Sequence, residues 1–271
     1  MSNINNIVVG LDLSNNAQEV LNRAFLIAKT NNSQVVVVHG VDIGFFDKFI
    51  SVAKIEEVIK NATKSVYLEL QRANTQDVKY SVEVQKANAS NLIIEVAKDK
   101  NASLIVIGAN EKKDFSTKIL GSTAHNVAQK SHLPILIVKN NAKEVYKNIV
   151  AFSDLSEVSQ KSLAFTRDFF HEKDIKCVYA YKKMSEIDYR FHDEIDNKQE
   201  IELEVQAYEK EKFEEFIKEN KLTNTQLIEN TLGATNALMN YVSENDNDLV
   251  ALGSNGVNSV GSFLYGSTSS Y

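Results

Sequence analysis

The stretch IVVGLDLS at residues 7–14 decides the fold, because it returns as IVAFSDLS at residues 149–156. Its two aspartates, Asp12 and Asp154, lie 142 residues apart, and two further pairs of segments have a spacing of 145 residues. These pairs are LIVIGAN at 104–110 with LVALGSN at 249–255, and Gly-Ser-Thr at 121–123 with the same tripeptide at 266–268. The chain therefore repeats itself once.

A period this long indicates two homologous domains, because solenoid repeats are only about 20–50 residues long. We expect the domains at residues 1–143 and 144–271, joined by a short polar segment. Each half alternates apolar runs with segments of helical periodicity. Uninterrupted runs such as VVVV at 35–38 and LIVI at 104–107 are typical of strands buried on both faces of a parallel sheet. The alternation predicts a doubly wound α/β sheet in each half.

The second half repeats this plan with weaker patterning. Its four predicted strands are Ile149–Phe152, Cys177–Ala180, Gln226–Ile228 and Leu249–Leu252. A long charged segment, His192–Asn220, has the pattern of an amphipathic helix with a solvated face. Five apolar residues are expected on its inner face: Ile201, Val205, Tyr208, Phe213 and Phe216.

Composition excludes several classes of protein. The 271 residues carry a net charge of −6, with 43% hydrophobic and 24% charged residues, as in an ordinary globular protein. An acidic chain argues against a nucleic-acid partner or an anionic membrane surface, which attract clustered Lys and Arg. A single cysteine, Cys177, excludes an intramolecular disulfide framework and fits a reducing compartment. No apolar run or leader sequence predicts a membrane span or secretion, so we expect a cytoplasmic protein.

The second half carries a glycine constellation, Gly253-x₂-Gly256-x₉-Gly266-Ser267-Thr268, which starts at the end of an apolar strand. Ligands of open α/β sheets bind beyond the carboxyl ends of the strands, where glycine lets backbone N–H groups approach phosphate. A helix that starts at Gly-Ser-Thr adds hydroxyls and the positive end of its dipole. Asp154 ends the first strand of this half and has the chemistry to accept hydrogen bonds from a ribose or base, or to hold a metal with phosphate.

The constellation differs from better-known phosphate motifs. A P-loop requires Gly-Lys-Ser/Thr, and no lysine precedes Ser122 or Ser267. The dinucleotide fingerprint follows a first strand, where this chain has Ser-Asp-Leu-Ser-Glu at residues 153–157 instead. The alternative is that the glycines serve only turns and helix caps. The spacing, the strand-end context and the helix start together favour phosphate binding.

These motifs resemble those of tandem-domain universal stress proteins. Their domains begin with a strand that ends in Asp-x-Ser and carry G-x₂-G-x₉-G-[ST] near the end. The resemblance implies an ATP-type ligand, with Mg as a companion ion, and a second-strand residue, nearest to Lys182, that touches adenine through its backbone. The implied ligand-binding residues are Asp154, Lys182, Leu252, Gly253, Asn255, Gly256, Gly266, Ser267, Thr268 and Ser269.

The first half departs from this pattern at one position. Gly108 and the Gly-Ser-Thr at 121–123 are present, but Glu111 stands where the second glycine is expected. A carboxylate beside phosphate is unfavourable in a partly dry cleft. We therefore expect the first half to bind nucleotide weakly or not at all, with Asp12 serving packing.

The second half is also short. Five residues follow Gly266, whereas the first half has room after Gly121 for a helix and the strand Ile135–Val138. We expect the strand order 3-2-1-4-5 in the first domain, and the same order without the last strand in the second. The run Leu249–Leu252 would then form an apolar sheet edge. We expect either a truncated chain or a partner subunit that covers this edge.

No residues form an assembled catalytic or metal site. The histidines lack metal-ligand spacing, and no G-x-S-x-G elbow is present. His39 and Cys177 are interpreted as structural, and Ser14 and Ser156 as helix N-caps. The function predicted is a stress-response regulatory protein that binds an adenine nucleotide, acting as a homodimer or through pairing of its two domains. The alternatives are an interaction or small-ligand module without nucleotide, or a slow ATPase.

Overall fold

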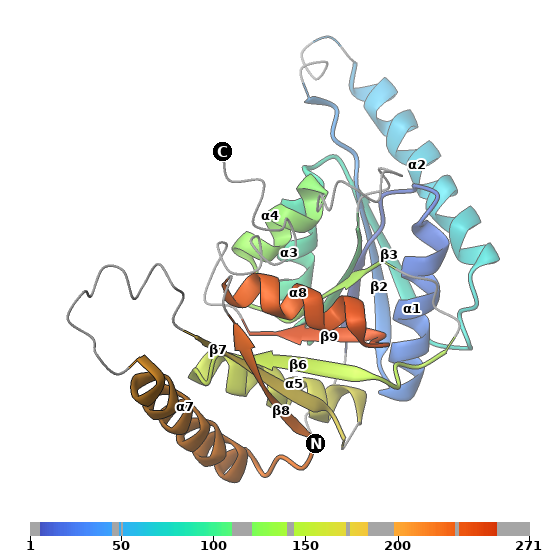
Figure 1. Cartoon of the computed structure of the whole chain (residues 1–271). Coiled ribbons are helices and arrows are strands. Elements are labelled where there is room, and N and C mark those ends of the chain that lie inside the picture. Colours follow the sequence, from blue (N-terminus) through green and yellow to red (C-terminus); the bar gives the residue numbers. More distant parts are fainter. Residues whose placement is uncertain are drawn as a thin grey trace. The chain divides into compact units, whose positions relative to one another are not determined.

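The computed structural model describes residues 6–44, 49, 51–109, 121–139, 144–171, 174–183, 198–230 and 233–253. It divides the chain into two units, residues 1–145 and 146–271, which are treated separately below (Figure 1). Each unit contains one sheet with parallel pairing throughout the described strands. No described helix is both long enough and apolar enough to cross a membrane.

The first unit alternates strands and helices in the predicted order. Its elements are β1 Asn6–Gly10, α1 Ala17–Thr30, β2 Gln34–Gly40, α2 Val52–Arg72, β3 Tyr80–Gln85, α3 Ala89–Asp99, β4 Leu104–Gly108, α4 Ser122–Lys130 and β5 Ile135–Val138. The sheet order is β3-β2-β1-β4-β5, which confirms the predicted 3-2-1-4-5 arrangement. The strand order therefore reverses between β1 and β4.

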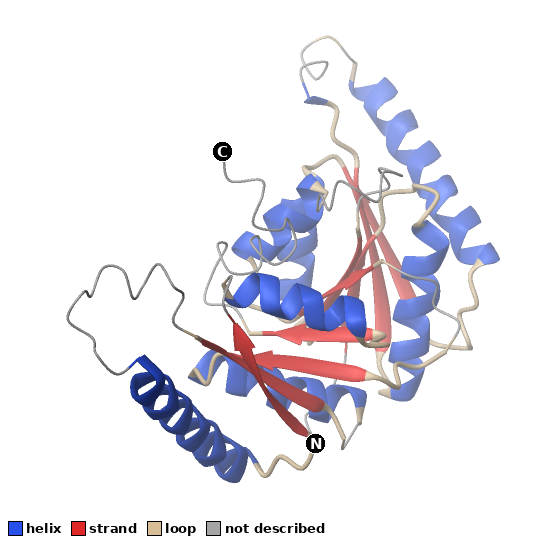
Figure 2. Cartoon of the chain, viewed as in Figure 1, coloured by secondary structure: helices blue, strands red, loops and turns tan. Residues whose placement is uncertain are grey.

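The central strands of the first unit are buried because helices cover both faces of the sheet (Figure 2). Helix α1 contacts α2, and α3 contacts α4, as expected when right-handed crossovers run in opposite directions from the centre. The runs Val35–Val38 and Leu104–Ile107 are consequently buried on both sides. This burial explains why these strands read as continuous apolar sequence.

The second unit has the same plan with four described strands. Its elements are β6 Ile149–Ser153, α5 Glu157–Phe170, β7 Lys176–Lys182, α7 Lys198–Asn220, β8 Thr225–Asn230, α8 Ala234–Glu244 and β9 Leu249–Leu252. The sheet order is β8-β7-β6-β9, so the four-stranded second sheet is as predicted. Leu163, Phe213 and Phe216 cover one face from α5 and α7, and Tyr241 of α8 packs on the other.

Two expectations from the sequence were wrong in detail. Helix α1 begins at Ala17 with Asn16 as its N-cap, so Ser14 lies two residues before the cap. Tyr208 of α7 is 60% exposed, although it was expected on the inner face. Ser156 is the N-cap of α5, and Cys177 is buried, both as predicted.

Strand β9 is less buried than its counterpart β4. All four residues of β9 are half-buried, whereas Leu104–Ile107 of β4 are buried. Within the described residues β9 pairs with β6, and β4 pairs with both β1 and β5. Among the described strands, β9 thus has one neighbour and β4 has two.

Candidate functional site

The strand order of the second unit places Asp154 and Gly253 beside one another. Asp154 follows β6 directly and Gly253 follows β9, and these strands pair in parallel with Phe152 opposite Leu252. The order of the sheet reverses between β6 and β9. In open α/β sheets the crevice at this reversal, beyond the carboxyl ends of the strands, is where ligands bind.

Asp154 sits in a tight turn between β6 and α5. Its Oδ1 accepts a hydrogen bond from the Ser156 backbone N–H at 3.0 Å. Leu155, between them, has a φ of 62°, in the left-handed region that bulky side chains rarely adopt. Ser156 Oγ in turn accepts the Ser159 backbone N–H at 3.2 Å and caps the helix. The turn fixes the carboxylate at the end of the strand.

The surroundings of Asp154 favour its ionised form. Partial burial alone raises the pKa of this carboxyl, but hydrogen bonds from Ser156 and Ser159 outweigh it and lower the pKa below its usual value. An ionised carboxylate accepts hydrogen bonds and donates none. The group is therefore suited to receive hydroxyl donors such as those of a sugar.

Gly253 is required by a close backbone approach. A Cβ at this position would lie 2.6 Å from Ser159 Cα, 2.7 Å from Ser159 N and 2.7 Å from the Val158 carbonyl oxygen. Real Cβ atoms do not approach backbone that closely, so only glycine lets the end of β9 press against the first turn of α5. The contact joins Gly253 to the helix that begins at the Asp154 turn. It also gives this glycine a packing role that its predicted part in phosphate binding did not include.

The two remaining described residues of the predicted site, Leu252 and Lys182, are each the last residue of a strand next to β6. Leu252 is the last residue of β9 and packs against the core cluster on the α8 side. Lys182 is the exposed last residue of β7, in register with Asn230 of β8. Strands β7 and β9 flank β6, which Asp154 follows, and Lys182 lies three residues beyond Tyr179, the partner of Ser153.

The other predicted residues lie outside the described part of the chain: Asn255, Gly256, Gly266, Ser267, Thr268 and Ser269, together with Glu111 of the first unit. The equivalent Gly-Ser-Thr of the first unit, at residues 121–123, lies within the described residues. There Gly121 is the N-cap of α4, with Ser122 and Thr123 in its first turn, and as a glycine it offers no capping side chain. In the first repeat, Gly-Ser-Thr thus starts a helix.

The Asp-Leu-Ser segment of the first unit forms a similar turn, but the helix that follows it begins two residues later. Asp12 Oδ1 accepts the Ser14 backbone N–H at 3.1 Å, and Leu13 has a φ of 55°. His39 Nδ1 lies 2.7 Å from the carbonyl oxygen of Leu11, which is a structural contact as predicted. A Cβ on Gly108 would meet the Val20 side chain at 3.1 Å rather than backbone.

Two serines of the second unit belong to the site and match none of the predicted motifs. Ser153 Oγ and Ser159 Oγ lie 2.8 Å apart, and the Asp154 turn lies between these two residues in the sequence. In the aligned repeats, Leu11 stands in place of Ser153 and Ala17 in place of Ser159. This replacement of apolar by hydroxyl side chains is the feature of the sequence by which the two serines could have been identified.

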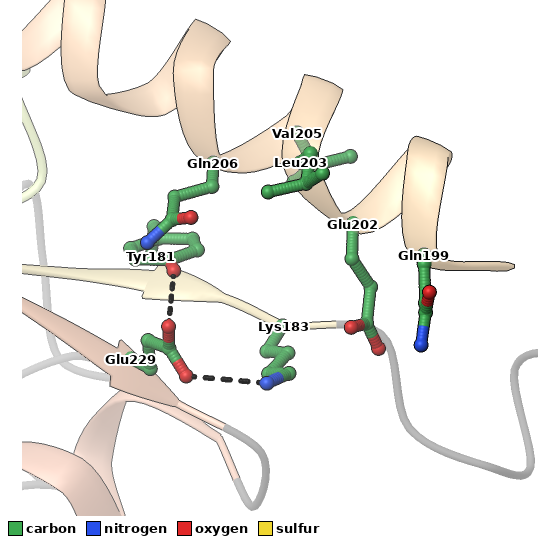
Figure 3. A pocket seen from close by; sticks show the side chains of 8 residues that line it. All are labelled: Tyr181, Lys183, Gln199, Glu202, Leu203, Val205, Gln206 and Glu229. Atoms are coloured by element: carbon green, nitrogen blue, oxygen red, sulfur yellow. Dashed lines mark hydrogen bonds and ion pairs between the residues drawn. The ribbon is translucent and has the colours of Figure 1, made fainter.

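A separate pocket of about 260 Å³ lies between α7 and the ends of β7 and β8 (Figure 3). Three of its polar groups are paired: Glu229 accepts from the Tyr181 hydroxyl at 2.9 Å and contacts Lys183 Nζ at 3.4 Å. Burial and Glu229 together raise the pKa of Tyr181 to about 12. Asp154 and Gly253 do not line this pocket, so it is distinct from the strand-order reversal.

No three described His, Cys, Asp or Glu side chains cluster as a metal site. The described part of the candidate site is thus a carboxylate, a glycine contact and a hydroxyl pair.

Comparisons with known proteins agree with this architecture. The model of the universal stress protein family matches twice, at residues 3–139 and 145–271. A universal stress protein of Methanocaldococcus jannaschii is 30% identical over 142 residues, covering 51% of this chain and 84% of the relative. The stress response protein NhaX of Bacillus subtilis is 25% identical over 166 residues, covering 51% of this chain and all of the relative.

Solved structures share the fold over most of the chain. A universal stress protein from Archaeoglobus fulgidus has a TM-score of 0.64 at 17% identity, covering 91% of this chain and 86% of that one. A protein of unknown function from Pseudomonas aeruginosa has a TM-score of 0.61 at 15% identity, covering 91% and 80%. Each unit is thus a doubly wound α/β domain with its candidate site at the strand-order reversal. The chain belongs to the universal stress protein family, as a tandem member.

Proposed function

We propose that this protein is a stress-response regulator that binds ATP or a related adenine nucleotide at the carboxyl edge of the second sheet. The observation that carries the proposal is the juxtaposition of Asp154 and Gly253 at the strand-order reversal, with the Asp154 carboxylate held ionised. Membership of a family whose members are named for stress response supports the regulatory role. Nucleotide occupancy would bias the conformation of the protein or its choice of partner.

In this proposal the parts of the ligand follow the order of the strands. Asp154 receives the ribose hydroxyls, and the backbone near Lys182 on β7 lies toward the base. The segment after Gly253 carries the phosphates, through Asn255, Gly256, Gly266, Ser267, Thr268 and Ser269. The described strand order supports this assignment, because β7, β6 and β9 are consecutive neighbours. Mg²⁺ would accompany the phosphates.

We also propose that the first unit binds nucleotide weakly, because Glu111 adds negative charge where phosphate would lie. A cytoplasmic location is supported by the single cysteine, Cys177, which is buried and unpaired. We further propose that the protein forms a homodimer or that its two domains pair within one chain. Hydrolysis of ATP at this site would be slow, because the sequence offers no assembled acid/base pair.

The first test is native mass spectrometry of gently purified full-length protein. The proposal predicts co-purified ATP or AMP, or uptake of added ATP. Asp154→Ala should lower ATP affinity about tenfold to a hundredfold, the effect of losing hydrogen bonds to a charged group. Asp168→Ala removes an exposed carboxylate of the same unit, on α5, and should leave ATP affinity unchanged.

The outcome that contradicts the proposal is a protein that purifies empty or filled with lipid and takes up no ATP. That result would favour the second candidate, an interaction or small-ligand module on the same fold. Measured ATP turnover that depends on Asp154 and Gly266 would favour the slow ATPase instead. Turnover that survives substitution of both residues would indicate a contaminating enzyme.

A further inference from the structure

The hydroxyl pair below Asp154 ties together three pieces of the second unit. Ser153 Oγ accepts the Leu155 backbone N–H at 3.0 Å, which holds the turn against the end of β6. Ser159 Oγ donates to the Ser156 carbonyl oxygen at 2.9 Å, which holds the turn against the first turn of α5. The two hydroxyls contact each other at 2.8 Å. Strand end, turn and helix start therefore form one hydrogen-bonded unit.

Within this unit Ser159 is buried and Ser153 is half-buried. Ser159 is 3% exposed, and its backbone is the surface on which Gly253 presses. A buried hydroxyl costs free energy unless it is hydrogen-bonded, and both serines satisfy this condition with each other and with the backbone. Apolar residues fill the same positions in the first unit, where Leu11 and Ala17 are buried. The fold therefore does not need hydroxyls at these positions. Their presence in the second unit indicates a role in the candidate site.

We propose that Ser153 and Ser159 are positioning residues for ligand binding: they hold the Asp154 turn in the geometry in which its carboxylate receives the ligand. Their replacement by Leu11 and Ala17 is a second reason, besides Glu111, for weak binding by the first unit. The assignment rests on the proposed nucleotide-binding function and deepens it. Both turns share the left-handed leucine and the hydrogen bond from serine N–H to aspartate, so the hydroxyl pair is a difference between them at the site itself.

The charged surroundings of Asp154 indicate how the effect would be detected. Ser156 and Ser159 lower the pKa of Asp154 by hydrogen bonding, against burial, which raises it. Tyr179 of β7 interacts electrostatically with Asp154, and its hydroxyl donates to Glu209 of α7 at 2.7 Å. Loss of the Ser159 hydroxyl should therefore raise the pKa of Asp154. Binding that needs the ionised carboxylate would then be lost at a higher pH.

The test compares Ser159→Ala with wild-type full-length protein, using ATP as the probe. Alanine is the residue that the first repeat already carries at this position, so the variant is expected to fold. ATP affinity at neutral pH should fall roughly three- to tenfold, the effect of one lost hydrogen bond. On acidification, the pH at which half of the affinity is lost should move upward. Ser162→Ala makes the same chemical change one turn later in α5 and should alter neither quantity.

Ser153→Ala removes the hydroxyl that accepts the Leu155 N–H, and it should lower ATP affinity by a similar factor. Unchanged affinity in both serine variants would overturn the assignment. A loss of affinity in Ser159→Ala without a shift of its pH midpoint would also overturn it, because a merely structural role predicts that pattern. ATP binding by the wild-type protein is measured first. Absence of binding at every pH would overturn the proposed function itself.

Discussion

Leu13 and Leu155 are the residues at which the backbone departs most from ordinary preference within the two Asp-Leu-Ser turns. Their φ angles of 55° and 62° place bulky side chains in the left-handed region, at a cost of about 1–3 kcal/mol each. The hydrogen bond from each following serine N–H to the preceding aspartate offsets part of this cost. The same strain occurs at the same point of both repeats, so this turn belongs to the fold that the two units share.

Gly253 provides the sharpest prediction at this scale. Gly253→Ala should destabilise the protein by about 1–3 kcal/mol, as for overpacking, because its Cβ would collide with the backbone of Ser159. Gly108→Ala is the matched control in the first unit. Its Cβ meets a Val20 methyl at 3.1 Å, which can shift by a few tenths of an ångström. Chemical denaturation of both variants measures the difference, and equal free energies of unfolding would contradict the account.

At the scale of the element, helix α5 has a side-chain N-cap supplied by the preceding turn, and helix α1 has none. Ser156 Oγ caps α5 through the Ser159 N–H, whereas Asn16 at the start of α1 makes no side-chain cap bond. Both helices were expected to begin with a capping serine. The difference arises because the chain runs two residues further after Ser14 before α1 begins.

Substitution of the two serines should therefore have unequal effects. Ser156→Ala should cost about 1 kcal/mol of stability, the usual value of an N-cap. Ser14→Ala should cost less, because Ser14 Oγ accepts only the Asn16 N–H at 3.3 Å, before the helix. Thermal and urea unfolding of the full chain would measure both. A larger loss for Ser14→Ala would contradict the capping assignments.

The elements differ in how well the sequence predicts them. Strands such as β2 and β4 are buried on both faces, so their apolar runs identify them without ambiguity. Helix α7 is ambiguous because its apolar residues are unevenly spaced. Tyr208 precedes Phe213 by five residues, which at about 100° per residue places the side chains about 140° apart. Burial of Phe213 and Phe216 therefore turns Tyr208 toward solvent, a competition that periodicity alone does not resolve.

At the scale of the whole molecule, two units of one topology differ at the candidate site. The internal repeat predicts the shared strand order and the positions of Asp12 and Asp154 at the ends of central strands, and both are confirmed. The Ser153–Ser159 pair was not predicted, because two serines acquire meaning only when the fold brings their hydroxyls together. The contact of Gly253 with α5 was hidden for the same reason: it joins residues almost a hundred positions apart.

The central claim is that one of the two units binds nucleotide. Its most direct test is calorimetric titration of full-length protein with ATP, comparing Asp12→Ala with Asp154→Ala. These variants remove the same carboxylate from similar turns. The account predicts one bound nucleotide per chain in the wild type, near-normal affinity in Asp12→Ala, and an affinity about tenfold to a hundredfold lower in Asp154→Ala. Unchanged affinity in Asp154→Ala, or a loss of that size in Asp12→Ala, would contradict it.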